Sequence, residues 1–539
     1  MPIPVKKTNS LKRSVADSDC GSGRNDPDVT HRHDGVGRTV VQRSTTSILN
    51  SISVDRQKPL GIRDQIHAGI ADLIANGFLR KSAKLPSCRA LARDLNVSIN
   101  SVLGAYSKLM DDGAILSRQR SGYFVALDVN RMEPPRSAKD DINSPNIVER
   151  ITRRRLPSTA GCISRPLDWP NYTYPFVCNQ IASNKFPLSE WRECTRLAMN
   201  SRDLSRWTSD NEYLDSEAFL EQICTRLLPM RGISAQPENV LVTMGAQQAI
   251  FVIATLLRGF GRIVAMEDPG YTDARNIFEQ TFDEVRYIPV DKEGLVVDRQ
   301  LAGCDLVFVT PNRQLPTVLS MSARRRAELL EVADREDFLI IEDDYEGDMD
   351  FNPKSLPPLY SGHARGRVIY TSSLSKSLAP GLRLGYLVAQ EELVREARAM
   401  RGMMIRHAPL ILQHTASLFL SFGYHERLRS RLHETFGQRW SVASELINDL
   451  FPDFEVQQEF GSTNFFFRSR AGRKAARIAE IARDKGVVIE PSDPCFSIAP
   501  YGDTTFRLGL AAVNTNLIEP GLRELRQAID TETLSVRET

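Results

Sequence analysis

The pattern of hydrophobic and polar positions divides the 539-residue chain into four regions. Residues 1–50 mix Ser, Gly, Asp, Arg, Lys and His with almost no hydrophobic periodicity, so we predict a disordered extension that buries too little apolar surface to offset its ordering entropy. Residues 51–127 show helical spacing and then two short apolar runs. Residues 128–165 are proline-containing, lack periodicity and are interpreted as a linker. Residues 166–539 alternate helical patterns with apolar runs.

The pattern of residues 51–127 predicts three helices and a hairpin. These elements are a helix within residues 60–78, a helix at 90–95, a helix at 99–110 whose N-cap is Ser98, and strands at 114–116 and 123–125. Two short helices around a tight turn are the signature of a helix-turn-helix, whose second helix enters the DNA major groove. The hairpin that follows is a wing.

Charge strengthens the expectation of DNA binding by this region. The whole chain carries a net charge of only +2, but eleven Lys or Arg residues against six Asp residues leave +5 between Asp55 and Leu127. Contacts to phosphates provide most of the non-specific affinity for DNA; a merely solvated basic face is the alternative. The predicted DNA contacts are Arg89, Ser98, Asn100, Ser101, Lys108, Arg118 and Arg120.

Residues 369–386 indicate a different chemistry, because an apolar run leads into a hydroxyl cluster, one lysine, a Pro-Gly pair and an arginine. A lysine amine condenses with an aldehyde, and hydroxyls and a guanidinium bind phosphate. We therefore predict pyridoxal 5'-phosphate (PLP) as cofactor, with Lys376 forming the Schiff base and Ser373, Ser375 and Arg383 binding the phosphate. A surface loop with a solvated lysine is the alternative.

Five apolar runs in the second half of the chain predict strands that are buried on both faces. They lie at residues 240–242, 262–266, 306–309, 338–341 and 368–370. Helical patterns between them indicate a largely parallel sheet, and ligands bind where the strands of such a sheet end.

Polar residues suited to PLP follow several of these strands. Free N–H groups of Gly245, Ala246 and Gln247, which open a helix, would bind the phosphate, and Tyr271 would stack on the pyridine ring. Asp343 would keep the ring nitrogen protonated, and Tyr345 would bond the 3-hydroxyl. Near the C-terminus, Arg507 within an apolar strand would pair with a ligand carboxylate.

Each of these residues also has a structural interpretation. A Gly-Ala turn often only starts a helix, a tyrosine after Pro-Gly often belongs to a turn, paired aspartates often cap loops, and an arginine in a strand is often half of a salt bridge. Because these residues occur in the right order at successive strand ends, we favour the interpretation that they bind PLP.

Other classes of protein find little support in the sequence. The eight cysteines include no C-x-x-C pair or Cys/His cluster, which indicates reduced thiols and no metal site. The sequence contains neither a Walker loop nor G-x-G-x-x-G. No apolar run reaches membrane-spanning length and no signal-peptide core is visible, so we expect a cytoplasmic protein that does not contact the membrane.

The chain resembles a known family. From about Pro166 to Ala528 it is similar to fold-type I aminotransferases, through Ser-x-Ser-Lys-x-x-x-Pro-Gly-x-Arg-x-Gly-Tyr and the Asp-Asp-Tyr run at 343–345. With its GntR-like winged helix-turn-helix, it resembles the MocR/GabR type of PLP-dependent bacterial regulators. The resemblance implies an α/β aminotransferase-like domain with a mostly parallel sheet and a smaller C-terminal α+β subdomain, and the roles given above for Lys376 and the other residues.

Two positions depart from the patterns of these families. Leu315 replaces an aminotransferase asparagine that contacts the PLP hydroxyl, as is common in this type of regulator. Ile99 follows the serine of the recognition helix where GntR proteins usually have arginine.

The resemblance implies a transcriptional regulator that senses an amino compound as an external aldimine and works as a head-to-tail homodimer on promoter DNA, with weak or vestigial transaminase activity. A working aminotransferase with an accessory N-terminal domain is the main alternative. A third interpretation makes PLP a purely structural ligand.

Overall fold

A computed structural model describes residues 52, 54–55, 60–75, 78–79, 81–118, 121–126, 165–200, 207–208, 214–361 and 366–537. They belong to two compact units, one within Met1–Ile147 and one within Val148–Thr539. The predicted extension at 1–50 and the predicted linker up to residue 164 lie outside the described residues. The domain boundaries therefore remain predictions.

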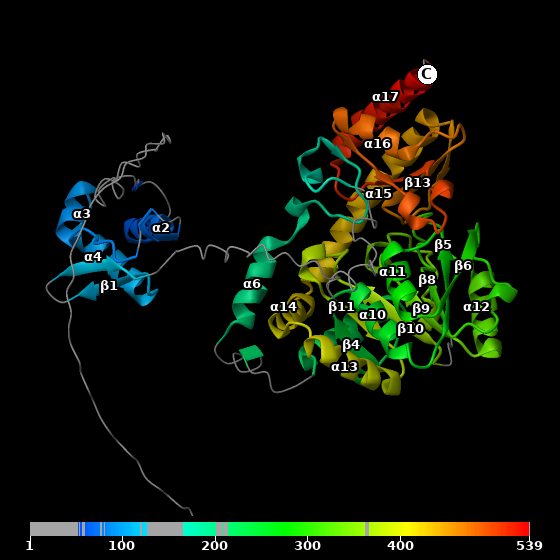
Figure 1. Cartoon of the computed structure of the whole chain (residues 1–539), viewed down its shortest axis with the longest axis horizontal. Helices are drawn as coiled ribbons and strands as arrows, with labels where there is room; N and C mark the ends of the chain where they lie inside the picture. Colours follow the sequence, from blue (N-terminus) through cyan, green and yellow to red (C-terminus); the bar gives the residue numbers. More distant parts are fainter. Residues whose placement is uncertain are drawn as a thin grey trace, which may run out of the picture. The chain divides into compact units, whose positions relative to one another are not determined.

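The first unit is a small helical domain with a hairpin (Figure 1). Its elements are α2 (Ile62–Ala75), α3 (Cys88–Asp94), α4 (Ile99–Asp111), β1 (Ile115–Arg118) and β2 (Gly122–Val125). The hairpin is antiparallel, with Ile115 opposite Val125. A single core joins all three helices to the hairpin, with Ile70, Tyr106 and Leu109 almost fully buried. The predicted winged helix-turn-helix is therefore confirmed.

The second unit is built on an eight-stranded sheet (Figure 1). Its strands are β4 (Val240–Thr243), β5 (Ile263–Asp268), β6 (Glu284–Asp291), β7 (Gly294–Leu295), β8 (Leu306–Val309), β9 (Leu339–Asp343), β10 (Val368–Ser373) and β11 (Gly385–Val388). They are ordered β4-β11-β10-β9-β8-β5-β6-β7. Only β11 and β7 run against their neighbours, so the carboxyl ends of the other six strands share one edge.

Helices cover both faces of this sheet. The helices of this part of the chain are α6 (Leu188–Ala198), α8 (Glu217–Gln222), α9 (Leu228–Met230), α10 (Ala246–Leu257), α11 (Thr272–Thr281), α12 (Ala323–Glu336), α13 (Glu391–Ile405) and α14 (Leu410–Ser421). Alternate strand residues face opposite cores: Val264 and Met266 pack with α10, α11 and α13, whereas Ala265 packs with α12. Burial on both faces explains the apolar runs within β4, β5, β8, β9 and β10.

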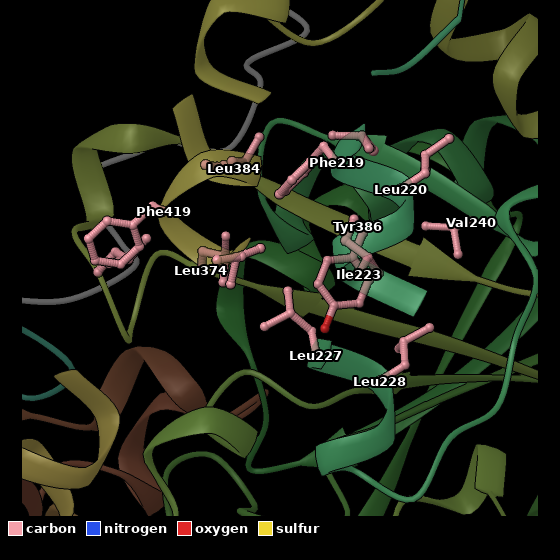
Figure 2. Packing of buried hydrophobic residues seen from close by; sticks show 14 of the residues in the cluster. Phe219, Leu220, Ile223, Leu227, Leu228, Val240, Leu374, Leu384, Tyr386 and Phe419 are labelled. Atoms are coloured by element: carbon pink, nitrogen blue, oxygen red, sulfur yellow. The ribbon is translucent and has the colours of Figure 1, made fainter. Parts of the chain in front are cut away.

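A third core lies beside β4 and β11 and anchors the turn after β10. Figure 2 shows Leu374 and Leu384 packed among Phe219, Ile223 and Phe419. These two leucines flank the turn that carries Lys376, and the Leu374 N–H donates to the Leu384 carbonyl at 3.0 Å. The turn is therefore fixed at both ends by buried apolar contacts.

The chain ends in a smaller α+β subdomain. Its antiparallel sheet has the order β12-β13-β16-β15. The elements are α15 (Tyr424–Leu450), β12 (Phe454–Gln457), β13 (Asn464–Ser469), α16 (Ala475–Asp484), β15 (Glu490–Pro491), β16 (Thr505–Gly509) and α17 (Ile518–Arg537). A separate parallel pair joins β14 (Val487–Val488) to β3 (Tyr174–Pro175), so the segment after Arg165 is tied to this subdomain.

The fold class predicted from the sequence is confirmed, and the five predicted apolar strands correspond to β4, β5, β8, β9 and β10. The other three strands of this sheet, β6, β7 and β11, were not predicted from the sequence. No described helix has the length and apolar character needed to cross a bilayer.

Candidate functional site

A cavity of about 220 Å³ lies at the carboxyl ends of the parallel strands, and we call it the strand-end cavity. All ten residues predicted from the sequence to bind the cofactor line it. They are Gly245, Ala246, Gln247, Tyr271, Asp343, Tyr345, Ser373, Ser375, Lys376 and Arg383. These residues come from four separate stretches of the chain, and the fold brings them together.

Lys376 lies in the turn after β10 and its side chain is half-buried. Burial lowers the pKa of its amine, while the carboxyls of Glu346 and Asp343 raise it. A lowered pKa increases the fraction of neutral amine, which is the nucleophilic form.

The start of α10 and the turn after β10 form a cradle of hydrogen-bond donors. Gly245 has a φ of 89°, and the first N–H groups of α10 receive no side-chain cap. The Ser375 hydroxyl is buried and has no hydrogen-bond partner among the described residues. Arg383 donates from Nη2 to the Met244 carbonyl at 2.8 Å. The cradle suits an anion with several acceptor oxygens.

Two glycines of this cradle have close neighbours where a side chain would begin, a guanidinium at Gly245 and backbone at Gly385. A Cβ on Gly245 would lie 3.1 Å from the Arg383 guanidinium, and a Cβ on Gly385 would lie 2.7 Å from the Gly245 Cα. The helix start and β11 therefore meet through backbone atoms alone.

Two consecutive aspartates at the carboxyl end of β9 have opposite environments. Asp343 lines the cavity, and its Oδ1 accepts from the Thr371 hydroxyl at 3.2 Å; burial raises its pKa to about 7. Burial would also raise the pKa of Asp344, but Arg231 at 2.8 Å, with Asn312 and Tyr370 each at 2.7 Å, lowers it. The Asp344 carboxylate thus has its hydrogen-bond partners within the protein, whereas Asp343 faces the cavity without a cationic hydrogen-bond partner.

Tyr271 and Tyr345 line the cavity beside Leu315. The Tyr271 hydroxyl donates to Asp273 at 3.0 Å. Burial and the nearby Glu346 carboxyl raise the pKa of Tyr345 well above its usual value, so this phenol is a hydrogen-bond donor at neutral pH.

Arg507 is not among the residues that line the cavity. It is buried in β16, and its Nη2 donates to Glu490 of β15 at 2.8 Å. The other oxygen of Glu490 accepts from Arg165, which does line the cavity, at 2.9 Å. The Arg507 Nε is buried without a partner among the described residues. One carboxylate thus bridges two arginines.

The sequence analysis missed several residues near the site. Arg165, Asn179 and Thr310 line the cavity, and Glu346 lies close enough to affect Lys376. Arg165 was assigned to the linker because the sequence around it lacks hydrophobic periodicity. Its position at the cavity depends on a hydrogen bond to Glu490, which is 325 residues away in the sequence.

The predicted DNA-contacting residues lie on the surface of the first unit. The Arg89, Asn100 and Arg118 side chains are exposed, and Arg118 lies over the Phe124 ring at 4.9 Å. Two others have partners within the protein. The Lys108 amine donates to Asp64 at 3.2 Å, and Ser98 caps α4 by accepting from the Ser101 N–H at 3.1 Å. Arg120 lies outside the described residues.

Within the described ranges, no three His, Cys, Asp or Glu side chains gather as metal ligands would.

Comparison with protein families gives two matches. Residues 62–125 match the bacterial regulatory proteins of the gntR family, and residues 179–525 match aminotransferase class I and II.

Whole-length relatives share both parts. The chain is 35% identical to the HTH-type transcriptional regulator TauR of Rhodobacter capsulatus, over 87% of this chain and 96% of that protein. It is 27% identical to the probable rhizopine catabolism regulatory protein MocR of Rhizobium meliloti, over 88% and 95% of the two chains.

Solved structures share the fold of the second unit. The kynurenine aminotransferase of Pyrococcus horikoshii superimposes with a TM-score of 0.62 at 22% identity, over 72% of this chain and 99% of that one. The α-aminoadipate aminotransferase LysN of Thermus thermophilus, solved with N-(5'-phosphopyridoxyl)-L-leucine, gives 0.61 at 22% identity, over 70% and 97%. At this identity the likeness establishes the fold.

Proposed function

Because this chain belongs to the MocR type of regulators, in which a gntR-family helix-turn-helix is fused to an aminotransferase class I and II domain, we propose that it binds PLP, senses an amino compound there and changes its binding to promoter DNA in response. It is a helix-turn-helix transcriptional regulator, and its second domain is of a kind that typically binds PLP. Cofactor, effector and their coupling to DNA are the proposal.

The main support for the proposal is that the strand-end cavity contains a buried hydroxyl without a hydrogen-bond partner and a buried carboxyl without a cationic partner among the described residues. The Ser375 hydroxyl lacks a partner, and Asp343 is buried with a pKa raised to about 7. A phosphate would accept from Ser375, and a protonated ring nitrogen would neutralise Asp343. PLP carries both groups, so a single ligand relieves both costs of burial.

The remaining cavity residues fit other parts of the cofactor. The amine of Lys376 would bind the aldehyde carbon, the N–H groups of Gly245, Ala246 and Gln247 and the guanidinium of Arg383 would hold the phosphate, and Tyr345 would donate to the ring oxygen. PLP supplies an aldehyde that reacts reversibly with amines.

The effector would be an amino compound with an acid group. Its amine would displace Lys376, and its acid group would lie towards the Arg165–Glu490–Arg507 bridge. Sensing requires that the effector bind two arrangements of the protein with different affinity. We propose a head-to-tail homodimer as the unit that has these two arrangements.

A borohydride experiment tests cofactor binding. Protein incubated with PLP and then reduced is expected to carry a stable pyridoxyl group on Lys376, mapped by peptide mass spectrometry, and Lys376→Ala is expected to carry none. Labelling of another lysine, or none, would contradict the proposal.

A second experiment tests sensing. Amino compounds are screened for a change in the visible absorbance of the bound cofactor, and the active ones are added to the protein with a duplex that it has selected from random sequence. We expect the same compounds to change the affinity for DNA.

Transamination is the second candidate function, favoured by the half-buried Lys376 with its lowered pKa, which suits proton transfer. Repeated turnover of an amino donor with an oxo-acid acceptor would establish it. A single, stoichiometric absorbance change without product accumulation would favour sensing.

A further inference from the structure

The recognition helix α4 exposes two apolar side chains on one face. Ile99 and Leu103 are each 45% exposed, and their spacing of four residues places them on the same side of the helix. Asn100 between them is also exposed. The opposite side, with Val102 and Tyr106, is buried in the core, so among the described residues Ile99 and Leu103 lie on the solvent-facing side of α4.

Several polar groups of α4 are already used inside the protein. Ser98 and Ser101 share a hydrogen bond of 2.8 Å and cap the helix, and Lys108 pairs with Asp64. Ile99, Asn100 and Leu103 therefore dominate what the first turns of α4 offer to a partner.

Charge around the helix identifies that partner as a nucleic-acid duplex. Exposed cations flank α4 on other elements: Arg89 and Arg93 on α3, Lys84 before it, and Arg118 on the wing. Exposed cations on the elements around the helix suit phosphates on either side of a groove, since the phosphate contacts position the helix and leave its own face for the bases.

The chemistry of the face selects a base. Apolar side chains discriminate in the major groove by contact with the thymine 5-methyl group, whereas arginine reads guanine. Neither Ile99 nor Leu103 carries a polar group, so neither side chain can read guanine by hydrogen bonds.

We propose that Ile99 and Leu103 recognise thymine methyl groups in the major groove, so that the operator of this protein is rich in A·T pairs beneath the first turns of α4. The inference rests on the proposed DNA-binding function and deepens it by naming two specificity residues.

The test uses a duplex that the full-length protein selects from random sequence. Each thymine is then replaced by deoxyuridine, which lacks only the 5-methyl group. We expect about fourfold weaker binding of the protein for each contacted methyl that is lost, equivalent to one buried apolar carbon.

A double-mutant comparison assigns the effect to the helix. Leu103→Ala is expected to weaken binding to the thymine duplex by a similar factor and to be insensitive to deoxyuridine at the thymine it contacts. Leu60→Ala is the matched control, because Leu60 is 50% exposed in the same unit but lies outside α4; it should keep full methyl sensitivity.

Three outcomes would overturn the inference. If thymine and deoxyuridine duplexes bind equally, the apolar face does not read thymine methyl groups. If Leu103→Ala weakens binding to both duplexes by the same factor, Leu103 affects DNA binding without contacting a methyl group. If the protein selects no duplex at all, the proposed DNA-binding function fails as well.

Discussion

In the strand-end cavity, polar groups are buried and some lack partners, whereas on the exposed face of α4 the hydroxyls are paired and the apolar groups face solvent. Ser375 has a buried hydroxyl without a partner, while Ser98 bonds Ser101. The contrast indicates two kinds of ligand. Buried polar groups without partners suit a small anionic molecule that accepts their hydrogen bonds. An exposed face whose own hydroxyls are already paired suits a large polymer that lies across it.

The largest expected effect is that of a substitution at Asp343 in the strand-end cavity. Asp343→Asn removes the charge that would neutralise the cofactor ring, and loss of one partner from a buried ion pair costs about 3–5 kcal/mol. We expect PLP affinity to fall by about a hundredfold or more, measured by titration of the cofactor absorbance. Glu342→Gln is the control, because Glu342 is also buried with a pKa of about 7 but bonds the Leu359 and Tyr360 N–H groups instead of lining the cavity.

The pH dependence of the cofactor-free protein gives a second check on Asp343. Its pKa is raised from 3.8 to about 7, so between these values the folded protein binds the proton that the unfolded chain releases. Stability therefore falls as pH rises from about 4 to about 7. Asp343→Asn should make the fall in thermal midpoint less steep; an unchanged slope would show that the carboxyl is not buried in its neutral form.

The next effect concerns the acid group of an effector. Arg507→Gln should weaken the response to acidic amino compounds about tenfold to a hundredfold, since a charge-assisted hydrogen bond contributes about 1.5–3 kcal/mol, and leave amines without an acid group unaffected. Dose–response curves of the cofactor absorbance measure it. Arg165→Gln is the matched variant, because both arginines share Glu490. If only Arg165→Gln weakens the response to acidic amino compounds, Arg165 and not Arg507 binds the acid group.

A smaller effect separates two serines of the same turn. Ser375→Ala should weaken PLP binding about tenfold through one lost bond to the phosphate, while leaving the cofactor-free protein as stable or slightly more stable, because an unsatisfied hydroxyl is removed. Ser377 is equally buried but donates to Asp348 at 3.1 Å, so Ser377→Ala should instead lower stability by about 1 kcal/mol. Cofactor titration and thermal unfolding distinguish the two variants. Identical behaviour of Ser375→Ala and Ser377→Ala would contradict the proposal that Ser375 binds the phosphate.

The smallest effect lies on α4. Ser98→Ala removes the N-cap and should destabilise the first unit by about 1 kcal/mol, measured by its unfolding transition. Asn100→Ala should leave stability unchanged and weaken binding to the selected duplex, because the exposed Asn100 side chain lies between Ile99 and Leu103 in the sequence of α4. Equal effects of both variants on stability would remove the distinction between the two residues.

Local patterns were sufficient to predict that the residues from Ser373 to Arg383 share one cavity, because the strand and the turn that carry them are contiguous. Asp343 and Tyr345 were predictable since parallel strands end at one edge. The bridge between Arg165, Glu490 and Arg507 was not, because Glu490 belongs to a two-residue strand without periodicity and its partners are distant in sequence. The pairing of Lys108 with Asp64 was missed for the same reason, as 44 residues separate them.

The backbone contact between Gly245 and Gly385 constrains how this protein can change. A side chain at Gly385 would meet the Gly245 Cα, so removing more atoms from position 245 cannot make room for it. Gly245 in turn has a backbone conformation that L-residues rarely adopt. Neither position can therefore rescue a substitution at the other, and chimeras joined between them retain the anion cradle only when both parents contribute glycine.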